Sequence, residues 1–200
     1  MSPSPEDADL VIADLVIADT RRWLERAVIG LNLCPFAKAV HVKGQIHYAV
    51  SFATGWRELL EAVERELLTL AAADPEVRDT TLLIAPLADA DFLLFNDLVG
   101  EAERRLVQLG LEGVLQIAPF HPQFQFAGTT PDDITNATNR APYPTLHLIR
   151  EASIDRAVAA YPNAERIYEA NMALLERLGP ARWDALEVGA RWQPPDPRRD

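Results

Sequence analysis

The residues with the greatest capacity for chemistry gather in one segment, residues 119–147. It carries two of the four histidines of the chain, His121 and His147, together with Arg140 and Tyr143. A histidine titrates near neutral pH and can move a proton, and a guanidinium forms paired hydrogen bonds to a carboxylate or phosphate. We therefore expect His121 and His147 to act as acid–base groups. Arg140 is expected to hold an anionic ligand, with Tyr143 as a hydrogen-bonding wall.

The segment that holds these residues is long, irregular and rich in proline and aromatic side chains. A connection of more than about 12–15 residues inside a compact domain is usually functional or disordered, and one with many apolar rings is expected to pack. We predict that it covers a polar ligand pocket, lined in part by Phe120 and Asn139. Two alternatives stay open: an ordered loop without a ligand, and an internal ion pair of Arg140 with Asp132 or Asp133.

The only cysteine of the chain, Cys34, lies in the stretch CPFA. This stretch resembles the active segment of glutaredoxins and of omega-type glutathione transferases. The resemblance implies a reactive thiol at a helix N-terminus, where the helix dipole lowers the thiol pKa. An amphipathic helix precedes Cys34 where those families have a strand, so a buried, inert cysteine is the alternative. A metal site of Cys34, His121 and His147 would match no known ligand spacing, and we expect neither a metal nor another cofactor.

The composition restricts the partners and the location of the protein. The chain has 200 residues, of which 48% are hydrophobic and 24% charged, as is typical of a globular domain. Its formal net charge of -11 disfavours binding to nucleic acid or to an anionic membrane surface. A single cysteine forms no internal disulfide, and no basic segment followed by an apolar one begins the chain, so we expect a cytoplasmic protein.

Hydrophobic periodicity predicts helices that alternate with strands. Apolar residues recur at helical spacing before Cys34, in the two long segments that begin at residues 54 and 89, and towards the C-terminus. Shorter β-rich or continuously apolar runs separate them. The predicted strands are 45–52, 80–87, 112–120 and 144–151, and the predicted helices are 9–31, 54–75, 89–110, a short one within 129–139, 153–162 and 163–179.

This order of elements predicts an α/β (or α+β) domain. It would contain a mixed, partly parallel sheet of four or five strands, packed with helices and extended by extra N-terminal and C-terminal helices. Ligands of such sheets bind beyond the carboxyl ends of the strands. Residues 85–87, 118–122 and 147–151 are predicted strand ends, so we expect the ligand pocket at that edge of the sheet.

Three short motifs, LNLCPFA, FHPQFQF and NRAPYPTLHLIRE, lie at separate places along the chain. Together they resemble an uncharacterised bacterial family, a domain of unknown function. The resemblance covers about residues 19–179 and implies a soluble bacterial protein, without supplying an activity or a catalytic residue. We expect residues 19–179 to form a single globular domain, residues 1–18 a flexible or helical leader, and residues 180–200 a proline-rich tail.

Three functions are predicted as alternatives. The first is binding of a small anionic metabolite beneath residues 119–147, with histidine acid–base chemistry if the protein is an enzyme. The second is thiol redox chemistry at Cys34. The third is a non-enzymatic interaction module, in which the amphipathic N-terminal helix docks a partner or a second copy of the chain in a homodimer.

Overall fold

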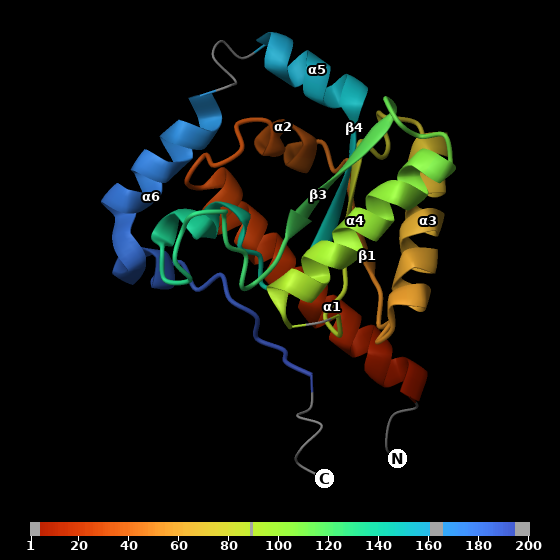
Figure 1. The fold of residues 1–200 in the computed structure, drawn as a ribbon, viewed down its shortest axis with the longest axis horizontal. Helices are drawn as coiled ribbons and strands as arrows, with labels where there is room; N and C mark the ends of the chain where they lie inside the picture. The colour runs from red at the N-terminus through yellow and green to blue at the C-terminus, as the bar shows by residue number, and fades with distance from the viewer. Residues whose placement is uncertain (1–4, 89, 161–165, 195–200) are drawn as a thin grey trace.

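The structure, a computed structural model, describes residues 5–88, 90–160 and 166–194 (Figure 1). One four-stranded sheet is surrounded by helices, as the sequence predicts. The strands are β1 (Ile46–Val50), β2 (Thr80–Ile84), β3 (Leu115–Phe120) and β4 (Thr145–Arg150). The helices are α1 (Pro5–Trp23), the π-helical turn η1 (Leu24–Ile29), α2 (Ala37–Val42), α3 (Trp56–Ala72), α4 (Phe92–Gln108), the 3-10 helix η2 (Ile134–Asn139), α5 (Glu151–Ala160) and α6 (Ile167–Asp184).

The sheet is mixed, with the strand order β1-β2-β4-β3. Strand β1 pairs with β2 in parallel, whereas β4 pairs antiparallel with both of its neighbours. The predicted α/β class and the partly parallel sheet are therefore confirmed. Helix α2 is an addition to the predicted elements. The predicted boundary between the helices 153–162 and 163–179 falls in residues 161–165, which lie outside the described residues.

One expectation about the strand ends is wrong. The three strands separated by helices, β1, β2 and β3, run in the same direction, as that pattern favours, but β4 inserts between β2 and β3 and runs against them, so residues 147–151 do not lie beside the carboxyl ends of the other strands. The carboxyl end of β4 therefore lies beside the amino ends of the other three strands. No long helix lies between β3 and β4, so the direction of β4 depends on which remote strands it pairs with, and that pairing appears only in the fold.

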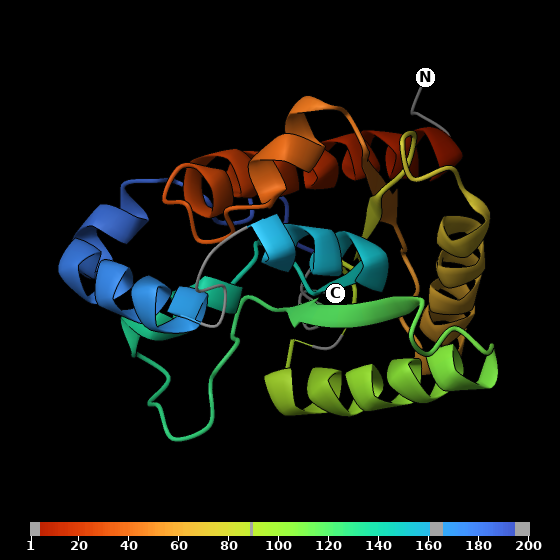
Figure 2. The same cartoon turned by 90° about the horizontal axis from the view of Figure 1, so that it is seen from above.

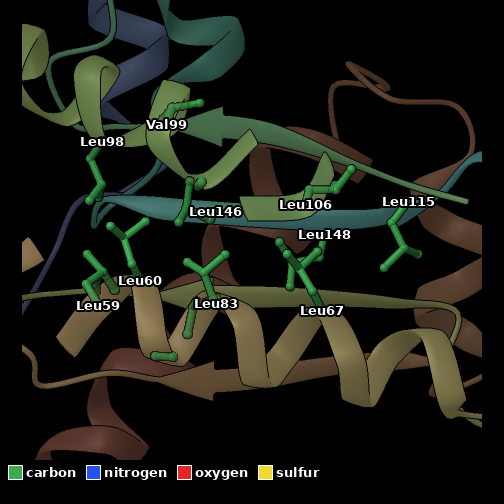
Figure 3. Packing of buried hydrophobic residues seen from close by; sticks show 14 of the residues in the cluster. Leu59, Leu60, Leu67, Leu83, Leu98, Val99, Leu106, Leu115, Leu146 and Leu148 are labelled. Atoms are coloured by element: carbon green, nitrogen blue, oxygen red, sulfur yellow. The ribbon is translucent and has the colours of Figure 1, made fainter. Parts of the chain in front are cut away.

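Helices α3 and α4 cover one face of the sheet and form the largest core with it (Figure 3). Leucines of the central strands, Leu83 in β2 and Leu146 and Leu148 in β4, are at most 1% exposed in this core. The apolar residues of α3 recur at helical spacing along its sheet-facing side. At the start of α4, the Asp91 carboxylate accepts hydrogen bonds from the N–H groups of Leu93 and Leu94. Burial positions both helices, and the Asp91 cap additionally fixes the start of α4.

Helices α1, α2 and α5 lie on the other side of the sheet, opposite α4 (Figure 2). Strand residues alternate between the two faces, so Leu82 and Ile84 of β2 pack against Val16 of α1 in a second core. Trp23, at the end of α1, packs edge-on against Phe120 with ring centroids 5.2 Å apart. The helices on this face therefore pack against the even-numbered residues of the strands, such as Leu82 and Ile84 in β2 and Phe120 in β3.

The C-terminal residues return to α1. Helix α6 is interrupted at Gly179, whose φ of 73° lies in the left-handed region, and continues to Asp184. Arg22 then donates hydrogen bonds to the carbonyls of Glu187 and Gly189. Part of the predicted leader lies in α1, and part of the predicted tail lies against it; residues 1–4 and 195–200 lie outside the described residues. The division into leader, domain and tail stays a prediction.

The long segment between β3 and β4 is ordered by its own polar contacts. Asp133 begins η2 by accepting hydrogen bonds from the N–H and hydroxyl of Thr135. Asn136 is fully buried, accepts a hydrogen bond from the Phe126 N–H and donates one to the Thr130 carbonyl. These bonds replace the ladder hydrogen bonds that a regular element would supply.

Candidate functional site

A pocket of about 570 Å³ lies between the sheet and the two short helices α2 and α5; we call it the α2/α5 pocket. Its floor is the sheet face that α3 and α4 do not cover, and Figure 2 shows α5 between α2 and β3. The residues that line it are Trp23, Leu24, Val28, Cys34, Pro35, Phe36, Ala37, Ala39, Val40, Lys43, Gln45, Ile46, Pro75, Glu76, Asp79, Thr80, Leu82, Gln116, Phe120, His147, Ile149, Ser153, Ile154, Arg156 and Ala157.

The pocket does not lie where the sequence predicted it. It includes the first residue of β1 and of β2, Ile46 and Thr80, and residues near the end of β4, His147 and Ile149. It therefore extends over the sheet towards the amino ends of β1 and β2, not beyond their carboxyl ends. The reversed direction of β4 explains the difference, because it brings the end of that strand beside the start of β2.

Most of the lining is apolar, and its charged side chains lie on a few neighbouring elements. Lys43 and Glu76 have exposed side chains with 60% and 81% of their surface accessible, so they mark the mouth of the pocket. Arg156 is also largely exposed, whereas Asp79 is buried. A molecule in the interior would thus meet mainly carbon, with Lys43, Glu76 and Arg156 towards the solvent and Asp79 buried.

His147 is the titratable group in the floor of the pocket. Its Nε2 lies 2.7 Å from the hydroxyl oxygen of Thr80, on the neighbouring strand, and its ring lies 6.1 Å from that of Phe120. Burial lowers the pKa of His147 to about 4, so the imidazole is neutral at pH 7. It nevertheless keeps part of its surface accessible, because it borders the pocket.

The protonation pattern of His147 follows from its neighbour. The Thr80 hydroxyl also lies 2.6 Å from the Leu148 carbonyl, which can only accept a hydrogen bond. The single hydroxyl proton therefore goes to Leu148, and Nε2 of His147 must donate to Thr80. A neutral imidazole with its proton on Nε2 has a lone pair on Nδ1, and Nδ1 has no hydrogen-bond partner among the described residues.

Cys34 also lines the pocket, just before α2. Burial raises the pKa of its thiol above the ordinary value, although the backbone N–H groups of Phe36 and Ala37 donate hydrogen bonds to the sulfur and lower it in part. The thiol is therefore protonated at neutral pH. This environment is closer to that of a buried structural cysteine than to that of a reactive thiolate.

A small polar cluster fastens α5 to the sheet. The Ser153 hydroxyl donates to the Asp79 carboxylate at 2.6 Å, and Arg156 donates to the Ser153 oxygen at 2.9 Å. Asp79 directly precedes β2, and the Glu151 N–H donates to the carbonyl of Val114, which directly precedes β3. The first turn of α5 is thus held at the sheet edge beside the pocket.

The other predicted site residues do not line this pocket. His121 is buried between the rings of Phe92 and Phe95, and its Nδ1 accepts a hydrogen bond from the Gln123 N–H at 3.0 Å. The Asn139 carbonyl accepts a hydrogen bond from the His121 N–H. Both residues hold the long segment together, and a role for them in ligand binding stays a prediction.

Arg140 and Tyr143 have structural partners of their own. Arg140 donates hydrogen bonds to the carbonyls of Phe124 at 3.1 Å and Pro131 at 2.6 Å, and so braces the long segment. The Tyr143 hydroxyl lies 2.8 Å from the Asp19 carboxylate, in the contact between α1 and the C-terminal residues. Of the seven predicted site residues, the structure brings only Cys34, Phe120 and His147 to one pocket.

Sequence reasoning missed several residues that define the pocket. Thr80 was treated only as the start of a buried strand, Trp23 only as part of an amphipathic helix, and Ser153 only as the start of a helix. The paired threonines that open β2 were the available signal, because a polar side chain in a buried strand needs a partner. The identity of that partner, His147, is 67 residues away and depends on the pairing of β2 with β4.

The fold and the pocket define an α/β domain with helices α3 and α4 on one sheet face and a largely apolar pocket on the other. The chain belongs to the family described as Protein of unknown function (DUF1415), whose model matches residues 15–185. The predicted resemblance to a domain-of-unknown-function family is thus confirmed. The comparison with curated proteins found no match, and the comparison with solved structures found none either.

Two further findings concern metals and membranes. In residues 5–88, 90–160 and 166–194, no group of three or more His, Cys, Asp or Glu side chains is arranged to hold a metal ion. Within those same ranges, no helix has the length and apolar character needed to cross a membrane.

Proposed function

We propose that the protein binds a small molecule with an apolar body in the α2/α5 pocket. The observation that carries this proposal is the pocket itself, about 570 Å³ in volume and lined mainly by carbon. Ligand sites in proteins are usually pockets of about 300–1,000 Å³ with apolar walls and a few polar groups that fix orientation. His147 and Thr80 in the floor supply such polar groups.

The helices that border the pocket support the proposal. None of the residues of α2 is buried, and none of residues 151–159 in α5 is buried. Short helices are stable in proteins mainly because they bury an apolar face. Val40 of α2 and Ile154 of α5 are apolar and line the pocket, so an apolar ligand would complete the packing of both helices.

This proposal revises the predicted class of ligand. An anionic ligand was expected because of Arg140, which braces the long segment and does not line the pocket. Acid–base catalysis was expected because of His121 and His147. A general acid or base is most effective when its pKa lies near the working pH, and the pKa of His147 is lowered to about 4. Binding is therefore the function that this geometry supports best.

The test is a titration with N-phenyl-1-naphthylamine, an uncharged probe whose fluorescence increases in apolar surroundings. Wild-type protein should enhance the probe fluorescence in a saturable manner. Ala157→Phe should weaken binding, because Ala157 of α5 lines the pocket, whereas Ala159→Phe on the exposed side of the same helix should not. Displacing roughly 55 Å² of buried apolar surface would weaken binding by about tenfold, or about 1.4 kcal/mol. Equal effects of the two variants, or no saturable binding, would refute the proposal.

Thiol redox chemistry and partner docking stay predictions. Because burial raises the pKa of the Cys34 thiol, this thiol is protonated at neutral pH, which does not favour redox chemistry. Helix α1 exposes the apolar side chains of Leu10, Val11 and Leu15, which would be available to a partner or a second copy. A cytoplasmic location and the absence of nucleic-acid or membrane partners were expected from composition and likewise stay predictions.

A further inference from the structure

We propose further that the ligand is an uncharged molecule that donates a hydrogen bond to Nδ1 of His147, as an alcohol, a phenol or an amide does. This inference rests on the proposed function of the α2/α5 pocket and assigns the chemical class of its ligand. It is carried by the hydrogen-bond chain from the Leu148 carbonyl through Thr80 to His147.

The chain of hydrogen bonds determines which nitrogen of His147 is available as an acceptor. Thr80 uses its only proton on the Leu148 carbonyl, so Nε2 of His147 donates to Thr80 and Nδ1 is left as an acceptor. Nδ1 has no partner among the described residues, and His147 borders the pocket. A ligand that fills the pocket displaces water from this imidazole. Such a ligand leaves a buried acceptor unsatisfied unless it supplies a donor, and an unsatisfied buried acceptor weakens binding.

The surroundings of His147 favour a ligand without charge. Its nearest identified neighbours are Thr80 and the ring of Phe120, and neither carries a charge. The titratable groups that line the same pocket are Cys34, Lys43, Glu76, Asp79 and Arg156. Cys34 is protonated at neutral pH, and Lys43, Glu76 and Arg156 have largely exposed side chains, while Asp79 accepts a hydrogen bond from Ser153.

An anionic group beside Nδ1 would meet a lone pair and not a proton. It would be stabilised only if His147 became protonated. With a pKa of about 4, protonation of His147 at pH 7 reduces the affinity by about a thousandfold before any attraction to the anion is counted. A neutral donor avoids this cost and uses the lone pair that the fold provides.

The test compares three naphthalenes that share one apolar body: 2-naphthol, which is uncharged at pH 7 and donates a hydrogen bond; 2-methylnaphthalene, which does not donate; and the anion 2-naphthoate. Their affinities are measured by displacement of N-phenyl-1-naphthylamine. We expect 2-naphthoate to bind most weakly to the wild type. The affinity ratio of 2-naphthol to 2-methylnaphthalene should fall by about tenfold in His147→Phe, which keeps a ring of similar size but removes the acceptor.

A second measurement needs no variant. In ¹⁵N-histidine NMR spectra of the wild type at pH 7, His147 should carry its proton on Nε2, and the resonance of the unprotonated Nδ1 should shift on addition of 2-naphthol but not of 2-methylnaphthalene. A proton on Nδ1, an unchanged affinity ratio in a folded His147→Phe variant, or tightest binding of 2-naphthoate would overturn the inference while leaving the pocket as a binding site. If none of the naphthalenes displaced the probe, and the probe itself did not bind, both proposals would fail.

Discussion

Tyr143→Phe tests whether one buried carboxylate joins α1 to the C-terminal residues. The Tyr143 hydroxyl lies 2.8 Å from Asp19 Oδ2 and accepts a hydrogen bond from the Trp192 N–H at 3.3 Å. The same carboxylate accepts hydrogen bonds from the Arg191 N–H and the Arg22 guanidinium, both at 2.6 Å. Asp19 is only 2% exposed, so its charge depends on these donors in place of water.

The size of the effect follows from the type of hydrogen bond. A hydrogen bond to a charged group contributes about 1.5–3 kcal/mol, and Phe in place of Tyr143 removes one such bond without opening a cavity. For a domain of this size, that loss lowers Tm by about 3–12 °C. The matched control is Tyr168→Phe, because Tyr168 is 46% exposed and its hydroxyl has no hydrogen-bond partner among the described residues. The control should change stability by less than about 0.5 kcal/mol.

The assay is urea denaturation at pH 7, followed by tryptophan fluorescence and repeated in acid. Burial alone would raise the pKa of Asp19, but the Arg191 N–H, the Tyr143 hydroxyl and Arg22 together lower it below its ordinary value of 3.8. A lowered pKa means that this carboxylate stabilises the folded state above pH 3.8, and that the contribution is lost as the pH falls through the lowered value. The difference between wild type and Tyr143→Phe should therefore be complete at pH 7 and smaller in acid. Equal stabilities of Tyr143→Phe and Tyr168→Phe would refute this account.

Three further changes have definite expected outcomes. Alkylation of Cys34 by iodoacetamide should be slow in the native protein and should accelerate past pH 9.0, since burial raises the pKa of the thiol; a rate independent of pH above neutrality would instead indicate a thiolate. Leu83→Ala, at a residue 1% exposed in the main core, should lower the free energy of unfolding by about 2–5 kcal/mol in urea denaturation, and a loss below that range would contradict the packing described. Arg140→Ala removes hydrogen bonds to the carbonyls of Phe124 and Pro131; it should increase proteolysis or hydrogen exchange in residues 121–139 without weakening binding of N-phenyl-1-naphthylamine, and a clear loss of probe binding would restore Arg140 to the site.

Local signals predicted the elements well because each lies within a short stretch of chain. The apolar periodicity that predicted α3 and α4 depends on residues a few positions apart, and the structure contains both helices. The short helix predicted within residues 129–139 is also present, as η2 with Asp133 as its N-cap. Where such a short helix begins depends on how the segment packs, which periodicity does not report.

The residues predicted for the site from their types keep their predicted roles only as predictions. Arg140, His121 and Tyr143 have the functional groups that ligand sites use, but their partners here are backbone carbonyls, aromatic rings and Asp19. The polar partners of a side chain come from remote segments: Asp19 lies 124 residues from Tyr143 in sequence. A group suited to catalysis is equally suited to holding a loop in place, and sequence alone does not separate these uses.

By itself the sequence determined the α/β class, most of the helices and strands, and the membership of a domain-of-unknown-function family. These follow from contacts between near neighbours in the chain and from short patterns. Tertiary structure alone decided that β4 lies between β2 and β3, and this placement brings His147 to Thr80 and opens the pocket beside α2 and α5. The physical reason is that strand order minimises the exposed apolar surface of the whole sheet, a global balance that no local stretch of residues specifies.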